Sequence, residues 1–325
     1  MNKIYKIIFL TNIYTAKKQG WFWETISKTL RFTGYLLSRF QPEALVTYTL
    51  DGTSLHIPLA HALPFLRCKY PTYSSNLGRI AALVHEKYPT MNLIDIGANI
   101  GDSVAILRHY AHFPILCIDG DPYFFKILEK NLIDKKDVYL YRAFIGDTKG
   151  VVSGQLCRTS GTMHLSHTDS TKKNLIATKK LSDIITHFDN IKNVRMIKVD
   201  TDGFDVRIIL SELDYLKKNK PILFFEYDPF LTEKQNMNAK NIFEKLYNIG
   251  YQYALFFDNA GDYLISLKLN NMEQLEDIHY YFSGRKMHRY CDICVFHDQD
   301  KQLFETARQQ ELTFFSQQRH YEYSI

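Results

Sequence analysis

The 325-residue sequence predicts an α/β fold in which helices cover both faces of a mostly parallel β-sheet, preceded by a helical arm and a β-hairpin. Two observations lead to this prediction. From residue 92 onward, short and wholly apolar runs alternate with helical segments, a pattern typical of parallel strands that are buried on both faces. Hydrophobic residues make up 46% of the chain, which is enough to bury a sizeable core.

Residues 1–72 are predicted to form an extension ahead of the main domain. Within residues 1–40 the apolar side chains recur at helical spacing, while Lys28, Arg31 and Arg39 lie elsewhere on the helix, which predicts a helical arm. Two interpretations are open. The arm packs on the main domain, or it is a basic amphipathic helix that contacts a membrane surface or a partner.

A hairpin is predicted after the arm. Residues 46–50 and 54–57 are rich in β-forming side chains, and the Asp51-Gly52 pair between them is typical of a tight turn. Residues 77–87 have the pattern of a helix that leads into the main domain.

The main domain is assigned to residues 73–300. Its helices are predicted to begin near Ser103, Tyr123 and Phe204, with a further helix at residues 239–248. The predicted parallel strands are residues 93–96, 115–118, 138–143, 196–199 and 222–225, followed by later strands at 251–257, 263–267 and 293–297, some of them antiparallel.

Two segments do not follow this pattern. Residues 150–181 match no helix or strand pattern, and a long insertion of this kind usually carries function or is disordered. Its histidines, His164 and His167, are candidate bases for a nearby reaction. Residues 301–325 are assigned to a C-terminal tail.

The most informative motif spans residues 93–103, Leu-Ile-Asp-Ile-Gly-Ala-Asn-Ile-Gly-Asp-Ser. A strand ends near its third residue and a helix begins near its last. Between them the backbone turns sharply, glycine permits a close approach to a ligand, and the helix N-terminus offers free amides. The glycines are four residues apart, unlike the GxGxxG spacing of dinucleotide sites. The predicted ligand-binding residues are Asp95, Gly97, Ala98, Asn99, Gly101, Asp102 and Ser103.

The acid in this motif indicates the ligand. A pyrophosphate would be repelled by Asp95, whereas the sulfonium and α-amino groups of S-adenosylmethionine carry positive charge. The motif therefore favours S-adenosylmethionine over a nicotinamide dinucleotide. A turn that binds no ligand is the alternative.

A second acid follows at the end of the next strand. Asp119 stands 24 positions after Asp95, where an acid accepts hydrogen bonds from both ribose hydroxyls of a nucleoside ligand. Gly120 follows it, and Ala143 and Phe144, at the end of the third strand, are expected to flank the adenine. Because NAD would use Asp119 in the same way, this acid does not separate the two cofactors.

Three carboxylates are the predicted catalytic residues. Asp200 and Asp202 follow the fourth strand and Glu226 ends the fifth, so all three are expected beside the methyl donor at the carboxyl edge of the sheet. One of them is expected to act as general base on an acceptor hydroxyl. Two could instead hold a divalent metal, but no motif supports one and no metal ligand is assigned. Asp205 is expected to cap the next helix.

These motifs together resemble the FkbM family of O-methyltransferases. Residues 197–204, Ile-Lys-Val-Asp-Thr-Asp-Gly-Phe, resemble the family signature KxDxEGxE, with Asp202 and Asp205 in place of its glutamates. The second motif departs from the family, because Ile118-Asp119-Gly120 replaces the usual Phe-Glu-Pro. The other matching segments are residues 75–81, 94–102 and 221–226.

The resemblance implies a class I methyltransferase fold and transfer of a methyl group from S-adenosylmethionine to a hydroxyl oxygen. From the members that act in polysaccharide pathways, it implies a sugar or glycan, or another small molecule, as acceptor. A nicotinamide-dependent oxidoreductase and an inactive binding protein with a methyltransferase fold are the alternatives. A nucleic-acid amino-methyltransferase is disfavoured, because residues 228–230, Asp-Pro-Phe, have one proline and follow the fifth strand.

Composition excludes several other classes. The Lys and Arg residues behind the net charge of +5 are scattered, which does not predict nucleic-acid binding. Five cysteines, an odd number, argue against a disulfide framework, and the lone pair Cys291 and Cys294 has no second pair for zinc. No apolar run approaches the ~20 residues of a membrane helix. These features favour the cytoplasm, with the N-terminal helix as a potential peripheral membrane contact.

Overall fold

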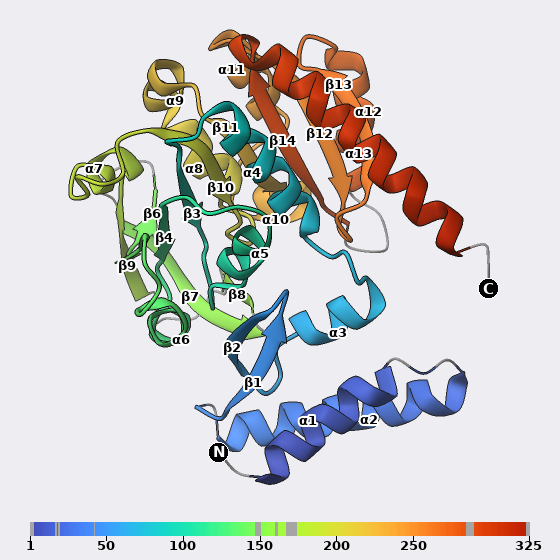
Figure 1. Cartoon of the computed structure of the whole chain (residues 1–325). Coiled ribbons are helices and arrows are strands. Elements are labelled where there is room, and N and C mark those ends of the chain that lie inside the picture. Colours follow the sequence, from blue (N-terminus) through green and yellow to red (C-terminus); the bar gives the residue numbers. More distant parts are fainter. Residues whose placement is uncertain are drawn as a thin grey trace.

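A computed structural model shows a large β-sheet with helices on both faces and the N-terminal elements attached at one end (Figure 1). The structure describes residues 3–16, 18, 20–41, 43–146, 151–159, 162–166, 174–283 and 289–322. The predicted α/β class is confirmed by this architecture.

Five parallel strands form one half of the sheet in the spatial order β5-β4-β3-β10-β11. The chain runs outward from β3 to β5 and then returns to the other side of β3 for β10. Ligands of open α/β sheets bind outside the carboxyl ends of the strands at such a reversal. The strands are β3 (Asn92–Ile96), β4 (Ile115–Asp119), β5 (Val138–Arg142), β10 (Val194–Val199) and β11 (Ile222–Tyr227).

Three antiparallel strands complete the sheet, as predicted for the late strands. They are β12 (Tyr251–Asp258), β13 (Tyr263–Lys268) and β14 (Cys291–His297), and β14 lies between β11 and β12. Both thiols of the Cys291–Cys294 pair are free and buried within β14. Within the described ranges, no group of three or more His, Cys, Asp or Glu side chains is arranged to hold a metal ion.

Each face of the sheet has its own hydrophobic core. One core includes Ile197, Phe225 and Phe256 and is covered by α7 to α9, α11 and α12; the other includes Leu93, Cys117 and Phe224 and is covered by α4 to α6 and α13. The helices are α4 (Ser75–Lys87), α5 (Asp102–Tyr110), α6 (Pro122–Leu132), α7 (Leu181–Ile185), α8 (Asp205–Ser211), α9 (Leu213–Asn219), α10 (Pro229–Lys234), α11 (Asn241–Asn248), α12 (Met272–Phe282) and α13 (Lys301–Glu322).

The N-terminal extension has a third core. The predicted hairpin is confirmed, with Asp51 (φ 47°) and Gly52 (φ 82°) in its turn. Its buried Leu55 packs in one cluster with Ile106 of α5 and Phe124 of α6, so the hairpin is joined to the main sheet. The extension consists of α1 (Lys3–Ala16), α2 (Trp21–Phe40), β1 (Leu45–Leu50), β2 (Thr53–Pro58) and α3 (Leu63–Lys69), so the arm is two helices.

The prediction that residues 150–181 match no regular element was wrong. They contain β7 (Val151–Thr159), β8 (Thr162–Ser166) and β9 (Asn174–Lys179), which join β6 (Phe144–Ile145) in a second sheet. Residues 151–159, Val-Val-Ser-Gly-Gln-Leu-Cys-Arg-Thr, lack the long apolar run of a core strand, because these strands pair with one another outside the main sheet.

Of the two candidate histidines, His164 lies on β8 opposite Cys157, and His167 lies outside the described residues. The segment assigned to a C-terminal tail contains α13. Glu311 of α13 forms a buried ion pair with Arg79 of α4, with 2.8 Å between Arg79 Nε and Glu311 Oε1.

Candidate functional site

The loop after β3 is bent by three residues with positive φ. They are Gly97 (81°), Asn99 (48°) and Gly101 (88°), and α5 begins at the next residue, Asp102. A Cβ on Gly97 would lie 1.8 Å from the carbonyl oxygen of Asp200, in the loop after β10. Glycine is therefore needed here because the loop packs directly on a neighbouring backbone, and this contact brings the ends of β3 and β10 together.

A first cavity opens between this loop and the ends of β4, β5 and β10. Asp119 lies in its wall, where Oδ2 accepts the Asn99 amide and Oδ1 accepts the Asp121 amide, both at 2.8 Å. Burial raises the pKa of Asp119 to about 7, and these two bonds oppose the shift. The lining of this first cavity combines the Asp119 carboxyl with apolar side chains, among them Ile96, Ile118, Phe124, Ala143, Phe144, Ile145, Phe204 and Ile208.

A second cavity, the acidic cavity, adjoins the first and shares Gly97, Asn99, Asp200 and Asp202 with it. It receives side chains from the extension, from α5 and from β10, β11 and β14. We define it by His61, Tyr73, Asp102, Ser103, Lys198, Asp200, Asp202, Glu226, Asp228 and Tyr290, together with Asn259 and Asp292 on its β14 side.

One buried cation connects this cavity to the loop. Lys198 Nζ lies 3.1 Å from Asp95 Oδ1 and 3.3 Å from Asp200 Oδ2. Burial alone lowers the pKa of Lys198, but the carboxylates of Asp95, Asp200 and Asp102 outweigh it and hold the pKa well above its usual value. Asp95 is fully buried, whereas the Asp200 side chain is 50% exposed. Lys198 therefore positions Asp200, the carboxylate that faces the cavity.

Two further carboxyls on neighbouring strands have raised pKa values. Glu226 on β11 is paired across the strands with Asp292 on β14. Burial, reinforced by neighbouring carboxylates including Asp200, raises the pKa of Glu226 well above its usual range and that of Asp292 to about 8. Protonated carboxyls both donate and accept hydrogen bonds, so this end of the cavity suits hydroxyl groups.

The extension contributes His61, which lies between β2 and α3. Its Nδ1 accepts the Leu63 amide at 3.2 Å, and burial lowers its pKa to about 4. The ring is therefore neutral at pH 7, with Nε2 left as an N–H donor. Sequence reasoning missed His61, Tyr73 and Asp292, because none belongs to a motif and only the folding of the extension and of antiparallel β14 brings them here.

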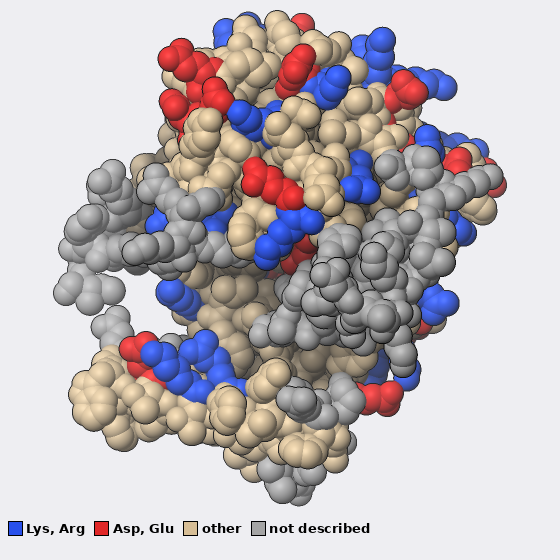
Figure 2. All heavy atoms as spheres, turned by 180° about the vertical axis from the view of Figure 1, so that it is seen from behind, with Lys and Arg blue, Asp and Glu red and all other residues tan. Residues whose placement is uncertain are grey.

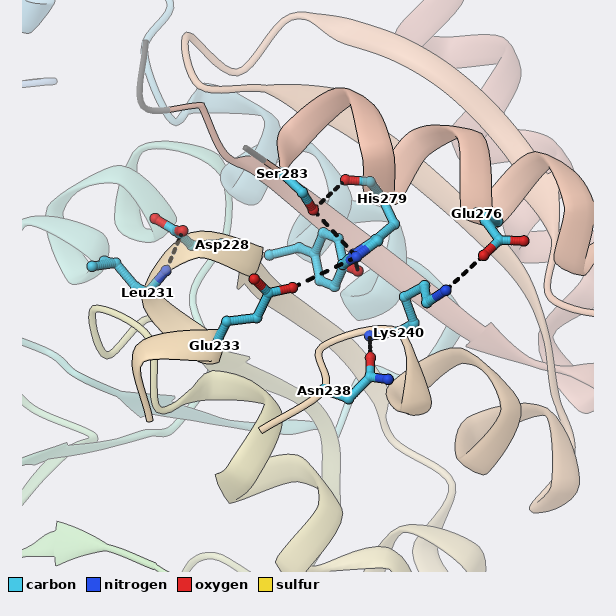
Figure 3. Close-up of polar contacts among 9 residues, drawn as sticks. Asp228, Leu231, Glu233, Asn238, Lys240, Glu276, His279 and Ser283 are labelled. Carbon is cyan, nitrogen blue, oxygen red and sulfur yellow. Dashed lines mark hydrogen bonds and ion pairs between the residues drawn. The ribbon is translucent and has the colours of Figure 1, made fainter. Parts of the chain in front are cut away.

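A polar network behind the cavity holds α10 against α12 (Figure 3). His279 Nδ1 lies 2.9 Å from the Tyr227 hydroxyl, and Nε2 lies 3.7 Å from Glu233 and 3.2 Å from Ser283 Oγ. Asp228 begins α10 by accepting the Leu231 amide at 2.8 Å. Since Asp228 and Leu231 also line the acidic cavity, this network fixes one of its walls.

The structure brings most of the predicted site residues to these cavities. Asp119, Gly120, Ala143 and Phe144 line the first cavity, and Gly97, Asn99, Asp102, Ser103, Asp200, Asp202 and Glu226 line the acidic one. Asp95, Ala98 and Gly101 line neither cavity.

Asp205 does not cap α8, contrary to the prediction. It is the first residue of α8, and its carboxylate accepts the amides of Thr201 at 2.9 Å and of Gly203 at 3.2 Å. Asp205 therefore holds the loop that carries Asp200 and Asp202.

The buried carboxyls predict how stability depends on pH. The folded-state pKa values of Asp119 and Asp205 are about 7 and that of Asp292 is about 8, whereas an unfolded Asp titrates near 3.9. The folded protein therefore binds more protons, and the free energy of unfolding should fall as pH rises from 6.5 to 8. Below pH 6.5 the lowered pKa of His61 acts in the opposite direction.

This trend can be measured by urea unfolding of the ligand-free protein at pH 6.5 and pH 8. One extra bound proton corresponds to about 1.4 kcal/mol per pH unit. Asp292→Asn, which removes one of the titrating groups, should flatten the dependence. A stability that is constant or rises over this interval would contradict the assignment.

The family model described as methyltransferase FkbM domain matches residues 95–253. No curated protein sequence matches the chain significantly. Among solved structures, methyltransferase FkbM from Methylobacillus flagellatus KT is similar at 14% identity and a TM-score of 0.38, over 72% of this chain and 53% of that one. Precorrin-6y C5,15-methyltransferase from Geobacter metallireducens GS-15 is similar at 10% identity and a TM-score of 0.35, over 68% of this chain and 88% of that one.

The matched residues run from the last part of β3 into β12 and so include the strands and loops that build both cavities. The fold itself follows from the strand order and from the reversal between β3 and β10. Residues 95–253 therefore match the methyltransferase FkbM domain, as the sequence resemblance predicted.

Proposed function

We propose that this protein transfers a methyl group from S-adenosylmethionine to a hydroxyl oxygen of a sugar or glycan. One observation carries the proposal: Asp200 lines both cavities. A donor bound in the first cavity and an acceptor bound in the second would meet beside a carboxylate that Lys198 holds in position.

The residues of the first cavity fit the donor. Asp119 offers a carboxylate to the ribose hydroxyls, while Phe144, Phe204 and Ile208 provide apolar surface for the adenine. Asp200 and Asp202, at the junction with the second cavity, complement positive charge on the donor. When bound, S-adenosylmethionine supplies an electrophilic methyl group on its positively charged sulfur.

The chain's own residues provide orientation and proton transfer. The first cavity and the acidic cavity meet at Gly97 and Asn99, so the acceptor hydroxyl would be held close to the donor, and this positioning supplies much of the rate. Asp200 accepts the proton that leaves the hydroxyl as its oxygen is methylated. Lys198 keeps that carboxylate in place and stays protonated throughout.

The lining of the acidic cavity suits a sugar. Tyr73 and Tyr290 offer aromatic surface and hydroxyls. Glu226 and Asp292, whose pKa values burial raises, offer carboxyl groups that can hydrogen-bond several hydroxyl groups. A phosphate or carboxylate on the acceptor would be repelled by the surrounding acids. A neutral or amino sugar is therefore the preferred acceptor class.

Two measurements test the proposal. Calorimetry should give a dissociation constant in the micromolar range for S-adenosylmethionine, about −8 kcal/mol. Radiolabelled methyl transfer should then be screened over neutral, amino and acidic sugars and oligosaccharides. Binding of NADH without binding of S-adenosylmethionine would favour the oxidoreductase alternative. Cofactor binding without transfer to any acceptor would favour an inactive binding protein.

Asp119→Ala should lower the affinity for S-adenosylmethionine at least tenfold. The change removes two ribose hydrogen bonds to a charged acceptor, each worth about 1.5–3 kcal/mol. Calorimetry at pH 8, where Asp119 is largely ionised, gives the largest difference. Asp189→Ala, at a side chain that is 96% exposed, is the matched control and should bind normally. Unchanged affinity in Asp119→Ala would show that this acid does not contact the ribose.

A further inference from the structure

The two N-terminal helices expose an unusual amount of apolar surface. In the described part of the chain, nine of the sixteen exposed large apolar side chains belong to α1 and α2, which form the mostly tan lower edge of the molecule in Figure 2. Soluble proteins rarely leave a patch of this kind without a function. The nine are Ile7, Leu10, Tyr14, Trp21, Phe22, Phe32, Tyr35, Leu36 and Phe40.

The exposed side chains form ordered stripes. On α1, Ile7, Leu10 and Tyr14 follow i, i+3, i+7 spacing and are 50–62% exposed, while Phe9 on the opposite side is buried. An apolar stripe at this spacing normally faces a core. Here it faces outward, so both sides of the helix are suited to apolar surroundings.

Helix α2 repeats this arrangement and also satisfies its own polar groups. Its outward face carries Thr25 and Thr29, whose hydroxyls donate to the backbone carbonyls of Trp21 at 2.8 Å and of Thr25 at 2.9 Å. Thr33 donates to Thr29 in the same way at 2.9 Å. These bonds leave fewer hydroxyls that need water, which lowers the cost of moving this face into apolar surroundings.

An aromatic cluster joins the two helices at their connecting turn. Tyr14 of α1 contacts the Trp23 ring edge-on at 6.5 Å between centroids, Trp23 contacts Phe22 at 5.5 Å, and Phe22 contacts Trp21 at 6.2 Å. Trp21 is 80% exposed. Lys18 lies 5.2 Å from the Tyr14 ring centroid, so a cation borders the cluster. Trp and Tyr with adjacent Lys are typical of segments at a membrane–water interface.

The charge of the segment indicates the kind of membrane. Residues 1–40 contain seven Lys and Arg and one acidic residue, Glu24, so their net charge of +6 exceeds the +5 of the whole chain. Basic residues beside an apolar face attract anionic lipid headgroups. In the described ranges, no helix is long and apolar enough to span a bilayer.

We propose that α1 and α2 dock on the surface of an anionic lipid bilayer, with the aromatic cluster at residues 14–23 inserted among the headgroups. The stripes supply the buried apolar area and the basic residues supply the attraction. The catalytic domain stays in water, and α3, which packs on α1, connects the docked helices to the acidic cavity through Leu63 and Leu66.

The chain provides its own reporter for this docking. Its two tryptophans, Trp21 and Trp23, both lie in the aromatic cluster, so tryptophan fluorescence reports on this cluster alone. Vesicles of phosphatidylcholine with phosphatidylglycerol should shift the emission of the full-length protein to shorter wavelength. The apparent affinity should be at least about tenfold higher than for phosphatidylcholine alone, and it should fall as salt is raised.

A paired substitution separates docking from folding. The double variant Trp21→Ala with Phe22→Ser should lower vesicle co-sedimentation about tenfold or more, with an unchanged thermal unfolding temperature. Ile133→Ser, at an apolar side chain that is 70% exposed elsewhere, should bind vesicles normally. Equal binding of the double variant and the native chain would overturn the proposal. The proposal would also be overturned if sedimentation showed that the native chain is a dimer and the double variant a monomer, because a second copy of the chain would then cover this face.

Discussion

Asp200→Asn should slow methyl transfer by about 10²–10⁴-fold, the range that general-base catalysis supplies. Asp200 is half exposed, lines both cavities and is held by Lys198 at 3.3 Å. Asparagine keeps its shape but cannot take up the proton of the acceptor hydroxyl. Because Lys198 retains Asp95 as its ion-pair partner, the fold should survive the change. Initial rates under saturating cofactor, on an acceptor found in the screen, measure the effect.

Binding measurements distinguish a chemical role from a structural one. The affinity of Asp200→Asn for S-adenosylmethionine should stay within a few-fold of the native value. Asp202→Asn and Glu226→Gln should be compared in the same assay, since both carboxyls line the acidic cavity. Burial raises the pKa of Glu226 and so disfavours its ionised form, and Glu226→Gln should therefore weaken acceptor binding more than it slows the reaction. If Asp200→Asn turns over normally and another variant loses methyl transfer, the residue changed in that other variant is the general base.

Gly97→Ala should abolish detectable cofactor binding and also destabilise the protein. The added Cβ would lie 1.8 Å from the carbonyl oxygen of Asp200, and φ at Gly97 is 81°. The loops after β3 and β10 must separate to admit it, which breaks the junction of the two cavities. Gly97→Val, with a larger side chain, should lose stability for the same reason.

Gly52→Ala is the matched control for this substitution. Gly52 has nearly the same φ, 82°, but a Cβ there would meet no atom within 4 Å. It should therefore cost only the backbone strain, about 1–2 kcal/mol, and leave cofactor binding unchanged. Urea unfolding and calorimetry on both variants separate the effect of backbone strain, which the two share, from the effect of the close contact with Asp200, which only Gly97→Ala has. Equal stability losses in the two variants would show that the loops tolerate the contact.

The parallel half of the fold and the loop after β3 could be predicted because their signals are local. A strand buried on both faces must be apolar along its length, and a turn that packs on another backbone needs glycine. The carboxyl ends of parallel strands meet at one edge, so Asp119, Asp200 and Glu226 could be assigned to one site from their positions in the chain alone.

The second sheet was not predictable in this way. Its strands β7, β8 and β9 are stabilised by hydrogen bonds to one another, and such pairing requires no apolar run in the sequence. Helix α13 was likewise not predicted, because its apolar residues are few. In the structure Leu303, Phe304 and Ala307 pack into the core, and Glu311 forms an ion pair with Arg79.

The α/β class, the likeness to the FkbM methyltransferase domain and the carboxylates at the parallel edge could all be predicted from the sequence, because each depends on residues close together in the chain. The differences among those acids arise only in the folded protein. The fold buries Asp95 against Lys198 and leaves Asp200 facing the cavities. It also added Asp292 and His61 from distant segments. The physical reason is that burial and long-range charge contacts set the protonation of each group, and neither can be read from local spacing.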